Sequence, residues 1–91
     1  MIDNLAQFKR AMTLGSRWES IYLLNCNEEP KIRVVTQVQT NGVYLSLPDS
    51  DEDSFMQFGK ATEYDFIDGN IIIAKWPDGR AYAQYTFLEA A

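Results

Sequence analysis

KIRVVTQVQTNGVYLSL, residues 31–47, predicts a β-hairpin and decides the fold class of the chain. Apolar and polar side chains alternate through residues 31–39, which is the period of a strand with one buried face. Asn41-Gly42 then predicts a type I′ turn, because both central residues of that turn need positive φ. The side chains that we expect to face the core are Ile32, Val34, Thr36 and Val38, followed on the partner strand by Val43, Leu45 and Leu47.

The segment before the hairpin predicts a short helix over residues 3–13. Leu5, Phe8 and Met12 recur at helical spacing and form one apolar stripe. Suitable ends are present, with Asp3 or Asn4 as the N-cap, Lys9 and Arg10 in the last turns, and Gly15 as the stop. A helix of this length is not stable alone, so we expect it to pack on a sheet.

The remaining segments predict further short strands joined by tight turns, of which Asp68-Gly69 and Pro77–Arg80 are the clearest. No connection is long enough for a crossover helix, so the strands should be antiparallel. We therefore expect residues 1–91 to form a single α+β domain. Its short N-terminal helix packs on a small, strongly curved antiparallel sheet or SH3-like barrel. The residues expected in its core are Leu5, Phe8, Val34, Val38, Leu45, Phe58, Phe66, Ile72 and Phe87.

Composition excludes several classes of protein. Apolar residues make up 46% of the chain and charged residues 23%, as in folded globular proteins. No apolar run approaches the ~20 residues of a membrane span. A single cysteine, Cys26, cannot form an internal disulfide, which fits a reducing cytoplasm. There is no histidine, so Ser/His and Cys/His catalysis are impossible. We expect a cytoplasmic, non-enzymatic protein without a cofactor.

The acidic stretch LPDSDEDSF, residues 47–55, is the strongest candidate for a functional site. Asp49-x-Asp51-x-Asp53 matches the opening of an EF-hand loop. That loop needs Gly at its sixth position and Glu at its twelfth, where this chain has Ser54 and Lys60. We therefore expect no metal site here.

Two interpretations of the acidic stretch stay open. It is a solvated connector, as charge clusters at loop tips commonly are, or it imitates the charge of nucleic acid. Carboxylates at i and i+2 of an extended chain stand ~6.6 Å apart, close to the ~7 Å between phosphates along a DNA strand. The candidate partner-binding residues on this second interpretation are Asp49, Asp51, Glu52, Asp53, Glu63, Asp65 and Asp68.

The chain also resembles a group of short, mostly uncharacterised proteins of bacteriophages, prophages and conjugative elements. The matching motifs are Leu14-Gly15-Ser16, then Arg33, Val35, Val38, Gln39, Thr40 and Asn41, and finally Phe58, Lys60, Ala61, Thr62 and Glu63. Gly59 and Phe55 depart from the pattern, which has Pro and Trp there. The resemblance implies a mobile-element protein that acts in a host bacterial cytoplasm, a setting that includes anti-CRISPR and anti-restriction inhibitors.

Two functions follow as expectations. The first is an inhibitor that binds a host defence protein, such as a nuclease or its complex, through a nucleic-acid-like acidic face. The alternative is a structural or accessory interaction domain of the element itself. The net charge of −5 opposes direct nucleic-acid binding, which could use only a face with Arg17, Lys31 and Arg33. The sequence leaves the oligomeric state open.

Overall fold

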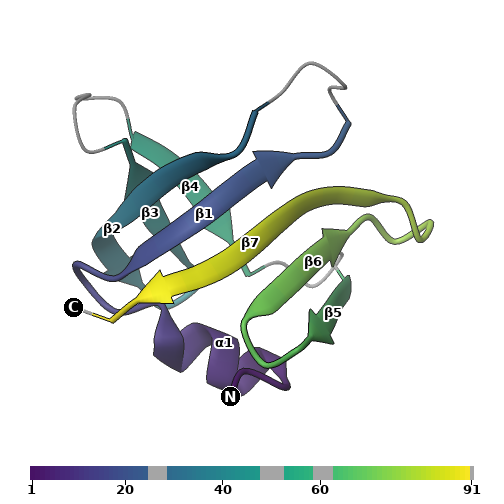
Figure 1. Ribbon diagram of the computed structural model, residues 1–91, viewed down its shortest axis with the longest axis horizontal. Helices are drawn as coiled ribbons and strands as arrows, with labels where there is room; N and C mark the ends of the chain where they lie inside the picture. The colour runs from purple at the N-terminus through teal and green to yellow at the C-terminus, as the bar shows by residue number, and fades with distance from the viewer. Residues whose placement is uncertain (25–28, 48–52, 59–62, 91) are drawn as a thin grey trace.

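A computed structural model describes residues 1–24, 29–47, 53–58 and 63–90 of the chain. Seven strands form one antiparallel sheet in the order β4-β3-β2-β1-β7-β6-β5. Figure 1 shows the sheet curling, with one helix lying against its lower side. The elements are α1 (Leu5–Ala11), β1 (Arg17–Tyr22), β2 (Lys31–Gln39), β3 (Gly42–Ser46), β4 (Asp53–Gln57), β5 (Glu63–Ile67), β6 (Ile71–Lys75) and β7 (Ala81–Glu89).

The predicted α+β class with antiparallel strands is confirmed, but the SH3-like barrel is wrong. Within the described residues the end strands β4 and β5 do not pair, so the sheet stays open. The Phe8 ring of α1 lies 5.6 Å from both Phe58, just after β4, and Tyr64 in β5. The Tyr64 hydroxyl adds one donor contact, to the Gln57 carbonyl at 3.4 Å. A helix side chain therefore links the two edges where a closed barrel would have strand pairing.

Phe8 is the centre of the hydrophobic core. Its side chain is fully buried, and its ring also contacts Trp18 edge-on at 5.6 Å and Tyr85 at 6.1 Å. We call the face of the sheet that carries Trp18, Tyr85 and Ile72 the inner face, because it packs against α1, and the opposite one the outer face. Other buried core residues are Ile2, Met12, Val35, Val43, Leu45, Met56, Ala74 and Ala83.

Helix α1 is shorter than predicted, but it begins as expected. Asn4 is the N-cap, and its side chain accepts a hydrogen bond from the Gln7 amide at 2.9 Å. The Gln7 side chain reaches back to the Asp3 amide at 2.6 Å, so two free N–H groups of the helix start are satisfied. Gly15 does not end the helix. It has φ of 86° and donates its N–H to the Val35 carbonyl of β2.

The predicted buried face of β2 is wrong. Val35 is buried at 1% exposure, whereas Ile32 and Val38 are 50% and 52% exposed. Val34 is half-buried. The strand turns its other face inward because Arg33 pairs with Trp18 and Val35 with Leu45. A register shift between Val35 and Gln37 then disturbs the simple alternation on which the prediction depended. Of the other predicted core residues, Phe8, Leu45 and Ile72 are buried, and Leu5, Phe58, Phe66 and Phe87 are half-buried against the core.

Of the predicted turns, Asp68-Gly69 matches its predicted type, whereas Asn41-Gly42 does not. Asp68 and Gly69 have φ of 56° and 79°, and Asn70 donates to the Ile67 carbonyl at 3.3 Å, as in a type I′ turn. Gly42, in contrast, lacks positive φ and begins strand β3. It is glycine for a steric reason. A Cβ there would lie 2.6 Å from the Phe55 ring and also meet the Met56 carbonyl oxygen.

Two further observations complete the fold. The β5–β6 turn is tied to the rest of the chain, because Gly69 accepts from Ile2 N–H at 2.7 Å and Asn70 from Phe87 N–H at 2.8 Å. Within the described ranges, no helix is long and apolar enough to cross a membrane.

Candidate functional site

The structure describes four of the seven predicted partner-binding acids. Asp49, Asp51 and Glu52 lie outside the described residues, as does Cys26. Asp53 begins β4, at one end of the strand order. The other three predicted acids belong to β5, at the opposite end, and to the turn after it.

We call Glu63, Asp65 and Asp68 the β5 acidic strip. Glu63 and Asp65 alternate with the inward-facing Tyr64 and Phe66, so both carboxylates project from the outer face and are exposed. Asp68 follows in the type I′ turn and is also exposed. The strip thus has the predicted i, i+2 spacing on an extended backbone.

Lys75 of β6 offsets part of the negative charge of the strip. It pairs with Glu63 in the strand register, and its Nζ lies 2.5 Å from the Asp65 carboxylate. The Lys75 and Asp65 side chains are 29% and 52% exposed, so water screens this ion pair. Glu63, Asp65 and Lys75 therefore share this part of the outer face, and Asp68 lies in the turn at the far end of β5.

Asp53 does not join the strip. It lies on β4, and its carboxylate accepts a long contact of 3.4 Å from the Thr36 hydroxyl of β2. β4 approaches β5 at its Gln57 end, where the Tyr64 hydroxyl donates to the Gln57 carbonyl, whereas Asp53 lies at the opposite end of β4, so the described acids form two groups. The described ranges also contain no group of three or more residues of the types that could hold a metal ion.

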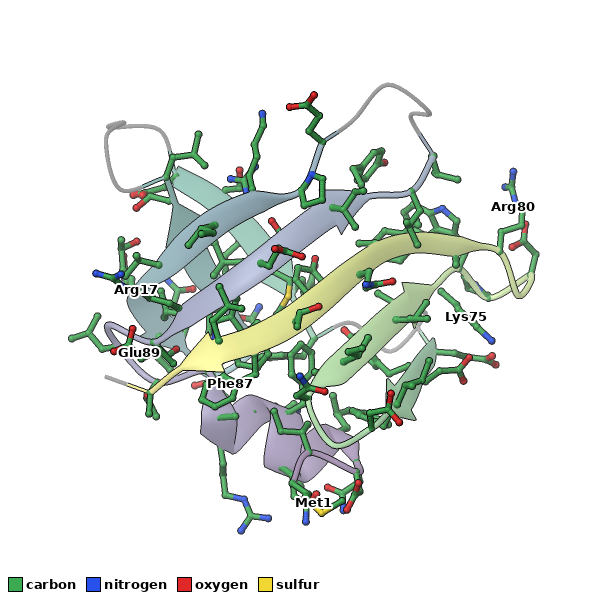
Figure 2. The ribbon with its side chains drawn as sticks, viewed as in Figure 1. Met1, Arg17, Lys75, Arg80, Phe87 and Glu89 are labelled. Atoms are coloured by element: carbon green, nitrogen blue, oxygen red, sulfur yellow. The ribbon has the colours of Figure 1, made fainter. Side chains whose placement is uncertain are left out.

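The basic residues considered for nucleic-acid binding do not share one face. Arg33 pairs with the buried Trp18 and so lies on the inner face, whereas Arg17 pairs with Val34 and belongs to the outer one. Figure 2 shows Arg17 and Glu89 at one end of the sheet, and Lys75 and Arg80 at the other. The strip of Arg17, Lys31 and Arg33 that the sequence allowed is therefore split between two faces.

Sequence reasoning missed a group of tyrosines on the inner face, which we call the tyrosine cluster: Tyr22, Tyr64, Tyr82 and Tyr85. Tyr22 pairs with Ala83, Ala83 with Ala74, and Ala74 with Tyr64, so two alanines separate the first and last tyrosines of that row. Tyr85 pairs with Ser20 in the next row, and Tyr82 lies at the register shift between β6 and β7.

The pKa values of two tyrosines in the cluster are raised. Burial, and then the neighbouring Tyr82, raise the pKa of Tyr64 to about 12. Burial is also the main reason that the pKa of Tyr85 is raised, with further increases from Tyr82 and Tyr64. Arg33 acts in the opposite direction and lowers the pKa of Tyr85.

Arg33 is held in place beside the cluster. Its Nε donates to the Ser20 hydroxyl at 2.9 Å, and Ser20 is the strand partner of Tyr85. The Arg33 side chain is half-buried and forms no ion pair within the described ranges. Tyr85 is only 9% exposed, and its hydroxyl makes no hydrogen bond there either. Because no buried side-chain oxygen of the described ranges lacks a partner, the Tyr85 hydroxyl must reach solvent.

Trp76 extends the aromatic surface at this end of the sheet. Its ring stacks on Tyr82 with centroids 4.2 Å apart, and it remains 37% exposed. Tyr22 lies next to these two rings, because the following residue, Leu23, donates its N–H to the Tyr82 carbonyl. The Tyr22 side chain is 47% exposed. Tyr, Trp and Arg are the residue types enriched in protein–protein contacts. Such rings also occur at the rim of ordinary cores, with the ring buried and the hydroxyl in water.

Comparison with family models, with curated proteins and with solved structures finds no match to this chain.

Proposed function

We propose that this chain acts by binding a protein, as an inhibitor of a host defence protein in the mobile-element setting that the resemblance implies. The observation that carries the proposal is the β5 acidic strip, in which Glu63 and Asp65 project from the outer face of an edge strand and Asp68 follows. An exposed strip of negative charge attracts the basic groove of a protein that binds nucleic acid. Binding rather than catalysis is also supported by the absence of histidine from the sequence.

The charge balance agrees with a role in recognition. Lys75 reduces the charge of the strip, yet the chain as a whole carries −5. Long-range attraction depends on this total field, and short-range contact depends on the strip itself. Acidic side chains on an edge strand also protect it against pairing with other chains, and this is the simpler explanation that the experiment must exclude.

A host-defence assay tests the proposal. The chain is expressed in bacteria with an active restriction or CRISPR system, and transformants of a targeted plasmid are counted. We expect the parent to restore transformation, and E63Q/D65N/D68N to restore much less. A matched control, E19Q/E29Q/E89Q, changes the net charge equally but away from β5 and should behave like the parent.

If the parent protects no targeted plasmid in any defence system tested, inhibition is refuted. The alternative, an accessory domain of the element's own replication, packaging or transfer machinery, predicts this result together with co-purification of another protein of the element. If the strip variant and the control protect equally, the inhibitor remains but the acidic strip is not its contact surface.

A further inference from the structure

We propose that Arg33 and the tyrosine cluster form a binding site for an oxyanion, a phosphate monoester or a carboxylate, carried on a flat aromatic group. This inference does not depend on the proposed inhibitor function. It uses the inner face of the sheet, whereas the acidic strip lies on the outer face.

The central feature of the proposed site is the Arg33 cation. Arg33 is half-buried in a protein of net charge −5, and within the described residues no carboxylate pairs with it. Its inner-face neighbours in the strand register are Trp18 opposite, Ser20 on the diagonal and Lys31 two residues earlier, none of which is acidic. A half-buried guanidinium without a counterion is costly, so its position favours an external anion.

The geometry of Arg33 leaves its free end available for a ligand. The Nε–H is already donated to Ser20 at 2.9 Å, which fixes the plane of the guanidinium. The remaining N–H groups are the ones that hold carboxylates and phosphates in pairs of parallel hydrogen bonds. A side chain fixed in this way loses less conformational freedom on binding than a free arginine does.

Tyrosine hydroxyls supply the second set of donors. The Tyr85 hydroxyl reaches solvent without a protein partner although the side chain is 9% exposed, so it has no competing acceptor in the described residues. A neutral phenol donates to an oxyanion and carries no charge that would repel it. Tyr82 is a second tyrosine of the cluster and lies beside Tyr22, because its carbonyl accepts from the Leu23 N–H at 2.9 Å.

The Trp76–Tyr82 stack specifies the rest of the ligand. The two rings lie 4.2 Å apart, and Trp76 keeps 37% of its surface exposed beside the cluster. A flat group attached to the oxyanion can lie on this surface, as offset stacks of aromatic rings do. The combination therefore favours an aryl phosphate or an aryl carboxylate over either free anion.

Titration of the whole chain with small probes tests this site. Phenyl phosphate, benzoate, inorganic phosphate and phenol are added to the isotopically labelled protein. The Nε–Hε signals of the arginines are followed by NMR, together with the backbone amide signals, which the Arg33 variants keep. We expect the Arg33 signal to shift saturably with phenyl phosphate or benzoate. The probe that binds with the higher affinity identifies the preferred oxyanion. Phenol should leave it unchanged, and inorganic phosphate should bind several-fold more weakly than phenyl phosphate.

Variants then locate the binding. R33Q should weaken it about tenfold or more, because a charge-assisted pair of hydrogen bonds is lost, and Y85F should weaken it several-fold. R17Q removes an equal charge from the outer face and should change nothing. If R33Q does not fold, the affinities of Y85F and R33K for the aryl probes test the site in its place. R33K should bind more weakly than the parent, since it keeps the charge but loses the paired hydrogen bonds of the guanidinium.

Three results would overturn the site. The first is the absence of a saturable shift with either aryl probe. The second is binding as tight as that of the parent by R33Q or, if R33Q does not fold, by both Y85F and R33K, and the third is an equal loss of affinity in R17Q and R33Q. The last result would show diffuse attraction to positive charge in place of a defined site.

Discussion

The indole N–H of Trp18 donates to the Ser16 hydroxyl at 3.0 Å, and that hydroxyl donates to the Thr13 carbonyl at 2.6 Å. The Trp18 and Ser16 side chains are fully buried. The Ser16 backbone joins the same region to β2, because its carbonyl accepts from the Val35 N–H at 3.0 Å. One hydroxyl thus connects the end of α1, the start of β1 and the largest side chain of the core.

Replacing Ser16 with Ala should destabilise the fold, since it leaves the Trp18 indole N–H and the Thr13 carbonyl without this partner. The expected cost is about 1–3 kcal/mol, typical of a buried polar group that loses its hydrogen bond. Urea denaturation measures it, and S54A, at an exposed serine of β4, is the control. Equal stability of S16A and the parent would contradict this account.

Gly42 offers a second test, which separates two reasons for a glycine. If it served a type I′ turn, Asn would be tolerated there, because Asn accepts positive φ. The structure instead places the Phe55 ring and the Met56 carbonyl against its Cα. G42A and G42N should therefore both lose about 1–3 kcal/mol of unfolding free energy from overpacking. A stable G42N would restore the turn explanation.

The fold was predictable where a signal is local. Asn4 caps α1, and Asp68-Gly69 forms its turn, because a cap or a turn depends on few neighbouring residues. The buried face of β2 was not predictable. Ile32 and Val38 on one side and Val35 on the other are all apolar, and the choice depends on which side Trp18 and Leu45 occupy.

The candidate sites follow the same division. The outward projection of Glu63 and Asp65 is visible in the alternation of TEYDF, whereas Lys75 beside them is set by the pairing of β5 with β6. The tyrosine cluster depends entirely on register between distant strands. Tyr22 and Tyr64 share a row only because β7 and β6 stand between them.

Alkaline pH should unfold the chain through its tyrosines. The pKa of Tyr64 is raised to about 12 from an ordinary 10.0, so above pH 10 the unfolded chain loses a proton that the folded chain keeps. This contribution to stability is complete below pH 10 and is lost as the pH rises toward 12. Tyrosinate absorbance followed together with circular dichroism should show part of the ionisation coinciding with unfolding.

Y64F is the matched variant for this titration, because it lacks the ionisable group and keeps the ring. Its stability should fall less steeply between pH 10 and 12 than that of the parent. If every tyrosine of the parent ionises near pH 10 while the chain stays folded, the burial of this hydroxyl is refuted.

The acidic connector should tolerate neutralisation. In D49N/D51N/E52Q/D53N the fold should survive, since Asp53 is exposed and the sequence predicts solvated charges for the other three, and such charges contribute little to stability. Calcium should not raise the melting temperature of the parent, because a ligand bound only by the folded form would do so. A calcium-dependent increase in the parent that is absent in the variant would reinstate the metal loop.

The central claim is that the β5 acidic strip contacts the partner, and association kinetics test it most directly. With the partner captured from the host and purified, association and dissociation rates are measured at low and high salt for the parent, E63Q/D65N/D68N and the control E19Q/E29Q/E89Q. We expect the strip variant to associate several-fold more slowly at low salt and to show a weaker salt dependence than either other protein. If the strip variant and the control lose the same association rate at both salt concentrations, only the total charge matters, and the claim is wrong.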